Sequence, residues 1–172
     1  MQMKNYNTMK IKVFLSCLMG VLLLASCSSY TEQETDPIPF EIVFEGPLFE
    51  GPNEANAEIR FNASDFGVEK EQIKSVRLKN IEVRTDEEDG FSNFESMLFN
   101  FYSNDISMTN VAAISPVPNE SVIQPNPMKD TEFDNFSKVD LFYLVLDANF
   151  TEEYYDDFIV KGEMVLTLKV KE

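Results

Sequence analysis

The chain has 172 residues, with 30 Asp or Glu against 14 Lys or Arg, and it contains no histidine. This length fits one domain, and the net charge of −16 excludes binding of nucleic acid, which gains affinity from Lys and Arg contacts. Without histidine there is no Ser-His-Asp or Cys-His catalysis and no histidine-containing zinc site. The six glycines form neither GxxxxGK nor GxGxxG, so nucleotide chemistry has no support.

Residues 1–26 are typical of a signal peptide. Lys4, Lys10 and Lys12 give this segment a positive start, and 13–25 is a run of apolar and small residues. As a helix such a run rises only about 20 Å, which is less than the hydrocarbon core of about 30 Å. Translocation and cleavage are therefore favoured over a permanent transmembrane helix. Met1, Met3 and Met9 could each begin the chain, and a compact signal starts at Met9.

The end of this segment, Leu24-Ala25-Ser26-Cys27, resembles the lipobox of bacterial lipoproteins, in which a Leu lies three residues before an invariant Cys. The resemblance implies that a diacylglyceryl group alkylates Cys27, that cleavage occurs before it, and that the new amino terminus is often acylated too. Two or three acyl chains anchor a protein stably in a membrane, because each buried methylene contributes about 0.8 kcal/mol. The alternative is an ordinary secretory signal with an incidental cysteine.

Cleavage before Cys27 changes the cysteine count and the charge. Cys17 is removed, so Cys27 stays as the only cysteine and no internal disulfide can form. Three of the 14 basic residues are lost with the signal, which leaves 11 basic and 30 acidic residues and a net charge of −19. Solvation of the surface is the expected role of this acidity, and attraction of cations or cationic partners is the alternative.

Residues 27–37 are predicted to be the lipidated Cys and a flexible tether, because they are polar and lack apolar periodicity. Ten extended residues reach about 33 Å, enough to hold a domain clear of the headgroups. In lipoproteins of diderm bacteria an Asp directly after the Cys favours the inner membrane, so Ser28 implies the outer membrane by resemblance. The serine- and acid-containing start resembles the export signal of surface lipoproteins in Bacteroidota, and it comprises Ser28, Ser29, Glu32, Glu34 and Asp36. Which face of the outer membrane the protein occupies stays open.

Residues 38–172 are predicted to form one antiparallel β-sandwich of about seven strands, Ig-like or jelly-roll-like. Apolar residues recur there with period two, most clearly in 158–170. The expected strands are 40–45, 57–62, 75–84, 97–102, 106–113, 139–147 and 158–170. The nearly continuous apolar run 139–146 indicates a central strand, although its periodicity alone does not exclude a helix. One helical turn is expected over 65–72, capped by Ser64 or Asp65, and the proline-rich segment 116–127 is expected to be an edge-protecting loop.

Two carboxylate clusters and one aromatic segment are the candidate sites. Paired carboxylates can hydrolyse a glycosidic bond, and calcium takes carboxylate and carbonyl oxygens. The clusters lie in predicted loops, where solvated charge is the simpler interpretation, and 86–90 lacks the alternate spacing of a calcium loop. In the segment 91–102 core packing is favoured over sugar stacking. The clusters are Asp86, Glu87, Glu88 and Asp89, and Glu152, Glu153, Asp156 and Asp157.

The sequence therefore predicts a noncatalytic, lipid-anchored β-sandwich that binds a protein, a glycan or another envelope component. No residue is nominated as catalytic, no cofactor is expected, and a metal site is left open. A carboxylate-based hydrolase resembling a glycosidase is one alternative. A purely structural accessory subunit of an envelope complex is the other.

Overall fold

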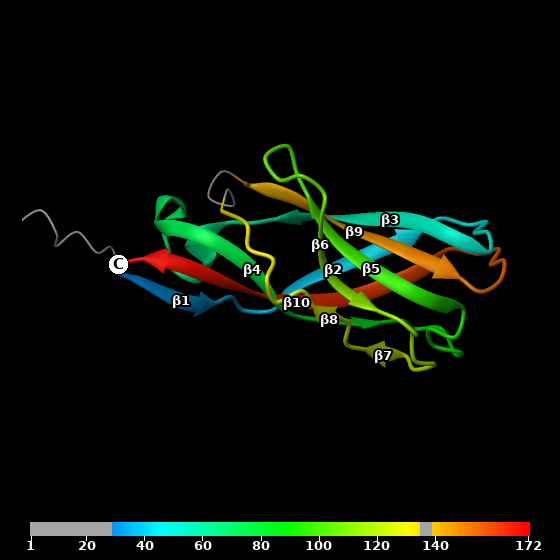
Figure 1. The fold of residues 1–172 in the computed structure, drawn as a ribbon. Helices are drawn as coiled ribbons and strands as arrows, with labels where there is room; N and C mark the ends of the chain where they lie inside the picture. Colours follow the sequence, from blue (N-terminus) through cyan, green and yellow to red (C-terminus); the bar gives the residue numbers. More distant parts are fainter. Residues whose placement is uncertain (1–28, 135–138) are drawn as a thin grey trace, which may run out of the picture. The chain divides into compact units, whose positions relative to one another are not determined.

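The computed structural model describes residues 29–134 and 139–172. Tyr30–Lys171 form one compact unit, in which the regular elements are strands and two short 3₁₀ turns (Figure 1). The predicted signal peptide and the lipobox residues Leu24, Ala25, Ser26 and Cys27 lie outside the described residues. Within the described ranges no helix is long and apolar enough to cross a bilayer.

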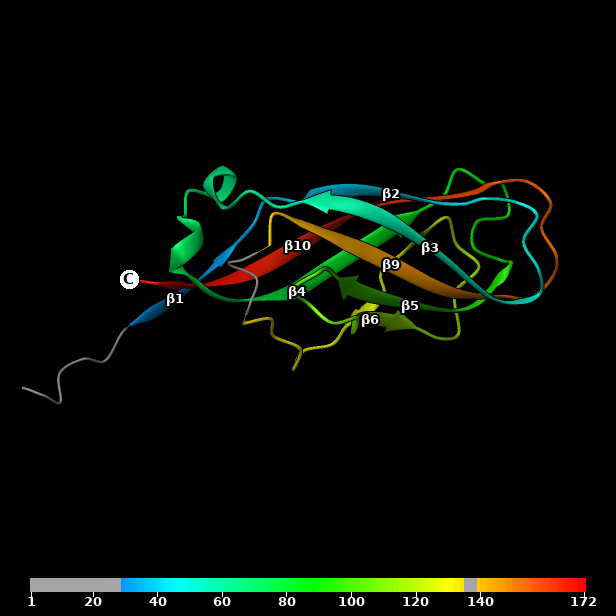
Figure 2. The same ribbon diagram turned by 90° about the horizontal axis from the view of Figure 1, so that it is seen from above.

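The strands form two antiparallel sheets, which confirms the predicted β-sandwich (Figures 1 and 2). In the first sheet β10 lies between β4 on one side and β1 and β2 on the other, and β7 pairs with the far edge of β4. Its strands are β1 (Tyr30–Glu34), β2 (Ile38–Phe44), β4 (Ile73–Arg84), β7 (Val122–Ile123) and β10 (Phe158–Lys171). The second sheet has the order β3-β9-β5-β6-β8. Its strands are β3 (Gly51–Arg60), β5 (Phe94–Tyr102), β6 (Thr109–Ile114), β8 (Asn126–Pro127) and β9 (Leu141–Phe150).

The core lies between the two sheets and is rich in phenylalanine. Side chains alternate along each strand, so every second residue of β10 faces inward. The ring centroids of Phe94 and Phe150 are 4.4 Å apart, and those of Phe94 and Phe158 are 4.8 Å apart. Core packing of the aromatic segment is confirmed for its four phenylalanines, and only the tyrosine at its end is exposed. The buried members are Phe91, Phe94, Phe99 and Phe101, and the exposed one is Tyr102.

All seven predicted strands are present, with ends that shift by a few residues. The apolar run at 139–146 belongs to strand β9 and not to a helix. This strand lies between β3 and β5, so Leu144 and Leu146 reach the core while Val145 is buried on the opposite face. Because β9 is buried on both faces here, its apolar run is nearly continuous.

The prediction of a flexible tether over 27–37 is wrong for residues 30–34, which form β1. β1 pairs with residues 167–171 of β10, and its Glu32 bonds Arg77 at 2.9 Å. Thr35, which follows, is buried, and its N–H donates to the Leu166 carbonyl at 3.0 Å. β1 is therefore held by backbone pairing and ion pairs, and its side chains are mostly exposed. Because it buries so little apolar surface, its sequence shows no apolar periodicity.

The single helical turn expected over 65–72 is also wrong. Two 3₁₀ turns form instead, η2 (Ala63–Phe66) and η3 (Lys70–Gln72), because Gly67 ends the first with φ of 72°. Their N-caps are Asn62 and Glu69, not Ser64 or Asp65, and Glu69 forms a capping box with Gln72. The proline-rich segment contains the short edge strands β7 and β8, which pair with β4 and β6.

Candidate functional site

Four loops gather at one end of the sandwich, and we call this surface the acidic end. Strand register brings them together, because Phe44 lies opposite Phe158 and Gly51 lies opposite Phe150. The four loops hold eleven Asp or Glu residues and no Lys or Arg. They are 45–50, 85–93, 115–121 and 151–157.

Backbone hydrogen bonds join these loops to one another. The N–H of Leu48 donates to the Tyr154 carbonyl at 2.7 Å, and the N–H of Tyr154 donates back at 3.1 Å. The N–H of Phe91 donates to the Glu120 carbonyl at 3.2 Å, and the N–H of Thr151 donates to Asn93 at 2.9 Å. The acidic end is therefore a connected surface whose loops are joined by backbone hydrogen bonds.

Two glycines allow the loops to approach this closely. A Cβ at position 46 would lie 2.6 Å from the Asp156 carbonyl oxygen, which is closer than any real Cβ contact. The N–H of Gly46 donates to Asp157 Oδ1 at 2.9 Å. Gly90 has φ of 59°, in the left-handed region, and a Cβ there would lie 2.7 Å from Glu120.

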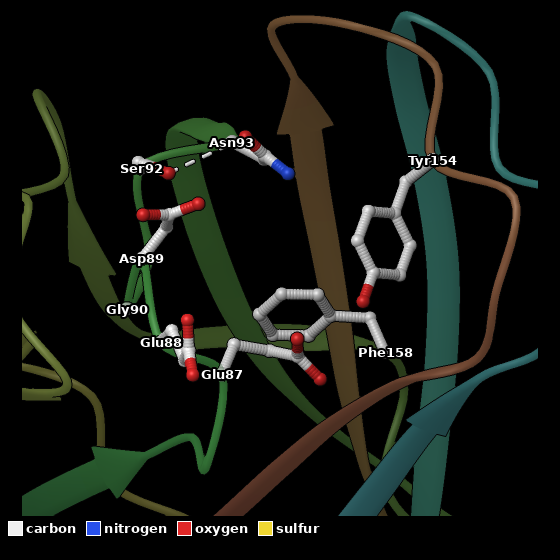
Figure 3. Close-up of a pocket in the computed structure, with 8 residues that line it drawn as sticks. All are labelled: Glu87, Glu88, Asp89, Gly90, Ser92, Asn93, Tyr154 and Phe158. Atoms are coloured by element: carbon white, nitrogen blue, oxygen red, sulfur yellow. Dashed lines mark hydrogen bonds between the residues drawn. The ribbon is translucent and has the colours of Figure 1, made fainter.

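A cavity of about 310 Å³ opens at the acidic end, near the lower limit for small-molecule sites (Figure 3). The loop between β4 and β5 supplies its carboxylates, and the rings of Tyr154 and Phe158 form its aromatic side. Burial first, and then a hydrogen bond and the negative charge of Glu87, raise the pKa of Tyr154 above 10.0. The lining residues are Glu87, Glu88, Asp89, Gly90, Ser92, Asn93, Tyr154 and Phe158.

The first predicted cluster is only partly brought into this cavity. Asp86 lies outside it and forms an ion pair with Lys161 of β10. The hydrogen bond from Lys161, followed by its positive charge, lowers the pKa of the exposed Asp86 carboxyl below 3.8. A general acid needs the opposite shift, so Asp86 is unsuited to that role.

The second predicted cluster is exposed along the β9–β10 loop. Glu153 accepts a hydrogen bond from the Tyr155 hydroxyl at 2.7 Å, which raises the pKa of Tyr155. Asp157 accepts the Gly46 N–H, so one carboxylate of the cluster fastens two loops together. Within residues 29–134 and 139–172, no group of three or more acidic side chains is placed to hold a metal ion.

Sequence reasoning missed an exposed apolar feature at this end. Phe49 and Tyr155, on neighbouring loops, are 64% and 74% exposed. Val43 and Ile159 lie opposite each other in the β2–β10 pairing and are also exposed. The alternation of β2 continues past Phe44, whereas the predicted strand ends at residue 45, directly before Gly46-Pro47.

The fold and this surface define an antiparallel β-sandwich with an acidic loop end, a class whose members serve unrelated functions. No family model matches the sequence, and a search of curated proteins found no match either. A solved structure of Desmodium yellow mottle tymovirus is 9% identical, covering 84% of this chain and 90% of that one, with a TM-score of 0.30. Turnip yellow mosaic virus gives 11% identity, 80% and 96% coverage and a TM-score of 0.22.

The VP2 subviral particle of infectious bursal disease virus is a third similar structure. It is 10% identical to this chain, covers 85% of this chain and 33% of that one, and has a TM-score of 0.27. Scores this low for all three viral proteins carry no argument about what this chain does. Function has to be argued from the residues of the chain itself.

Proposed function

We propose that this chain is a noncatalytic binding protein of a bacterial cell envelope, anchored in the outer membrane by lipid on Cys27. The observation that carries the proposal is the distance in sequence between the lipobox and the fold. Only Ser28 and Ser29 separate Cys27 from Tyr30, the first residue of β1. Three extended residues span about 10 Å, so the anchor would hold the sandwich directly by β1 rather than through a long tether.

The directions of β1 and β10 show how far the acidic end lies from the first residue of β1. β1 begins opposite the end of β10, where Tyr30 pairs with Lys171, whereas the acidic end lies at the start of β10. The 14 residues of β10 extend about 46 Å at 3.3 Å per residue. The first residue of β1 and the acidic end therefore lie at opposite ends of β10.

The chemistry of the carboxylates supports a binding role over a catalytic one. Asp86 has a lowered pKa and an ion-pair partner, and the four acidic residues of the β9–β10 loop face solvent. An ion-paired carboxylate and carboxylates that face solvent both lack the apolar surroundings found around a general acid. The joined loops instead provide a preformed surface, which lowers the entropic cost of binding.

Replacement of Cys27 tests the anchor. Cys27→Ala should release the protein into the soluble periplasmic fraction or leave an uncleaved precursor, whereas the wild type should partition into detergent. Cys17→Ser is the matched control, because position 17 lies in the segment that cleavage removes. Mass spectrometry of the mature N-terminal peptide should show lipid on Cys27. An unmodified Cys27, or an uncut leader, would refute the proposed anchor.

The cavity at the acidic end favours a carboxylate-based hydrolase as the second candidate. Glu87, Glu88 and Asp89 line it beside two aromatic rings, which is the concave arrangement that such an enzyme needs. The test is turnover of a panel of chromogenic glycosides. A loss of at least about a hundredfold in Glu87→Gln, with full activity in the exposed control Glu163→Gln, would favour the hydrolase over the binding protein.

A further inference from the structure

The pairing of β2 with β10 continues into the loops at the acidic end. Leu48 lies opposite Tyr154, which is where the Phe44–Phe158 register places it four residues further along. The alternation of burial continues as well, with Leu48 buried and Phe49 exposed. One outer surface therefore runs from the paired strands onto both loops, and its exposed apolar members form what we call the apolar stripe. The stripe consists of Val43, Phe49, Tyr155 and Ile159.

Carboxylates border Phe49 and Tyr155, the loop members of the apolar stripe. At its strand members Lys161 follows Ile159 by two residues on the same face of β10, and this lysine is paired with Asp86. The loops 45–50 and 151–157 contribute six acidic residues and no Lys or Arg. Among the residues that the structure describes, Asp86 with Lys161 is the one ion pair that involves any of the four loops of the acidic end. This surface therefore combines the exposed rings of Phe49 and Tyr155 with acidic residues of the same loops that have no basic ion-pair partner in the described part of the chain.

We propose that the apolar stripe is a docking surface for a basic protein segment that carries apolar side chains between its Lys or Arg residues. This inference rests on the proposed binding function and names the partner's chemistry. A buried Phe or Tyr contributes a large apolar area, and Tyr is typical of interface centres. The surrounding charge selects the partner's sign and speeds its approach.

Charge complementarity favours a basic protein segment over the other molecules that could cover the apolar stripe. Nucleic acid and anionic headgroups are repelled by the eleven carboxylates of the acidic end. A second copy of the chain is also strongly acidic and would be repelled. A neutral glycan could stack on Tyr155 but would leave the carboxylates unmatched. A cationic protein segment satisfies both the apolar and the charged parts of the surface.

A direct binding measurement tests the apolar part of the proposal. The mature full-length protein in nonionic detergent is titrated against a fluorescent ten-residue peptide that alternates lysine with leucine, with a glutamate–leucine peptide as the reference. Phe49→Ala/Tyr155→Ala should weaken binding of the lysine peptide at least about tenfold. The matched control Tyr102→Ala/Met108→Ala removes two exposed apolar side chains elsewhere and should stay within about twofold. Equal losses in the two double variants, or equal binding of the glutamate peptide, would overturn the proposal.

Charge variants test the electrostatic part and do not depend on the aromatic residues. Glu45→Gln/Glu50→Gln should weaken the lysine peptide and reduce the salt dependence of its binding, because two charges beside the stripe are lost. Glu54→Gln/Glu163→Gln removes two exposed charges from strands and should change neither quantity. No difference between these pairs would contradict a charge-selected partner. Circular dichroism confirms folding of each variant before titration.

Photo-crosslinking in cells tests whether the natural partner has the proposed chemistry. A crosslinker at position 155 should join a protein segment of net positive charge, and one at position 102 should not. Adducts to a second copy or to a glycan, or the absence of any adduct at position 155, would overturn the proposal. The peptide titration needs no membrane, so failure of the anchor and failure of the docking surface are distinguished.

Discussion

Thr35 tests how the polar strand β1 is attached to the fold. It follows β1, is 5% exposed, and contacts Leu166 twice. Its N–H donates to the Leu166 carbonyl at 3.0 Å, and its Oγ1 accepts the Leu166 N–H at 3.0 Å. Thr35→Val keeps the shape and the backbone bond but removes the acceptor, which leaves the N–H of Leu166 buried without its partner. The expected loss of unfolding free energy is about 1–3 kcal/mol.

Thr35→Ser is the matched control because it retains the hydroxyl and removes one methyl group. Its expected cost is about 0.8 kcal/mol, the value of one buried methylene-sized group. Urea denaturation of the mature protein measures both variants. Hydrogen exchange should locate the effect, with faster exchange across Tyr30–Glu34 in Thr35→Val than in the wild type. A Thr35→Val protein as stable as the wild type, or a Thr35→Ser protein less stable than Thr35→Val, would refute the role assigned to this hydroxyl.

Two further predictions concern the core and the cavity. Gly162→Ala should destabilise the fold by about 1–3 kcal/mol in urea denaturation, because its Cβ would lie 2.5 Å from both the Glu82 carbonyl and the Phe40 ring. An unchanged midpoint would contradict the close packing of β10 against its two neighbours. Tyr154→Phe should reduce the loss of stability in alkali. The raised pKa of Tyr154 means that the unfolded chain ionises first, so its contribution is present below pH 10.0 and is lost as the pH rises through the folded pKa. Equal alkaline destabilisation of wild type and variant would show that Tyr154 is not the group responsible.

The architecture was accessible from the sequence because most strands bury one face only. In β10 the alternation of buried and exposed residues extends over nearly the whole strand, and this is the pattern that predicts a half-buried strand. β1 gave no such signal, because its side chains are mostly exposed and its attachment comes from backbone bonds and the pairing of Glu32 with Arg77. Contacts between residues this distant in sequence leave no local pattern.

The candidate site was accessible only in part, for a related reason. The acidic residues of 86–89 could be named, but the cavity also needs Tyr154 and Phe158, which register and loop packing bring from another part of the chain. The apolar stripe was hidden by Gly46, which lets the β9–β10 loop approach and does not end the pairing of the β2 segment with the β10 segment. A glycine between two alternating segments can therefore indicate close backbone approach instead of a turn.

The charge of the acidic end is the feature that stability alone explains least. The eleven carboxylates of the joined loops all carry the same charge, and within the described residues one of them has a basic ion-pair partner. Solubility needs a net charge but not its concentration at one end beside exposed Phe49 and Tyr155. Features that oppose the folded state without a compensating contact are the ones expected at a functional surface. A cationic partner would supply that contact, and the repulsion that the free protein tolerates would then become attraction in the complex.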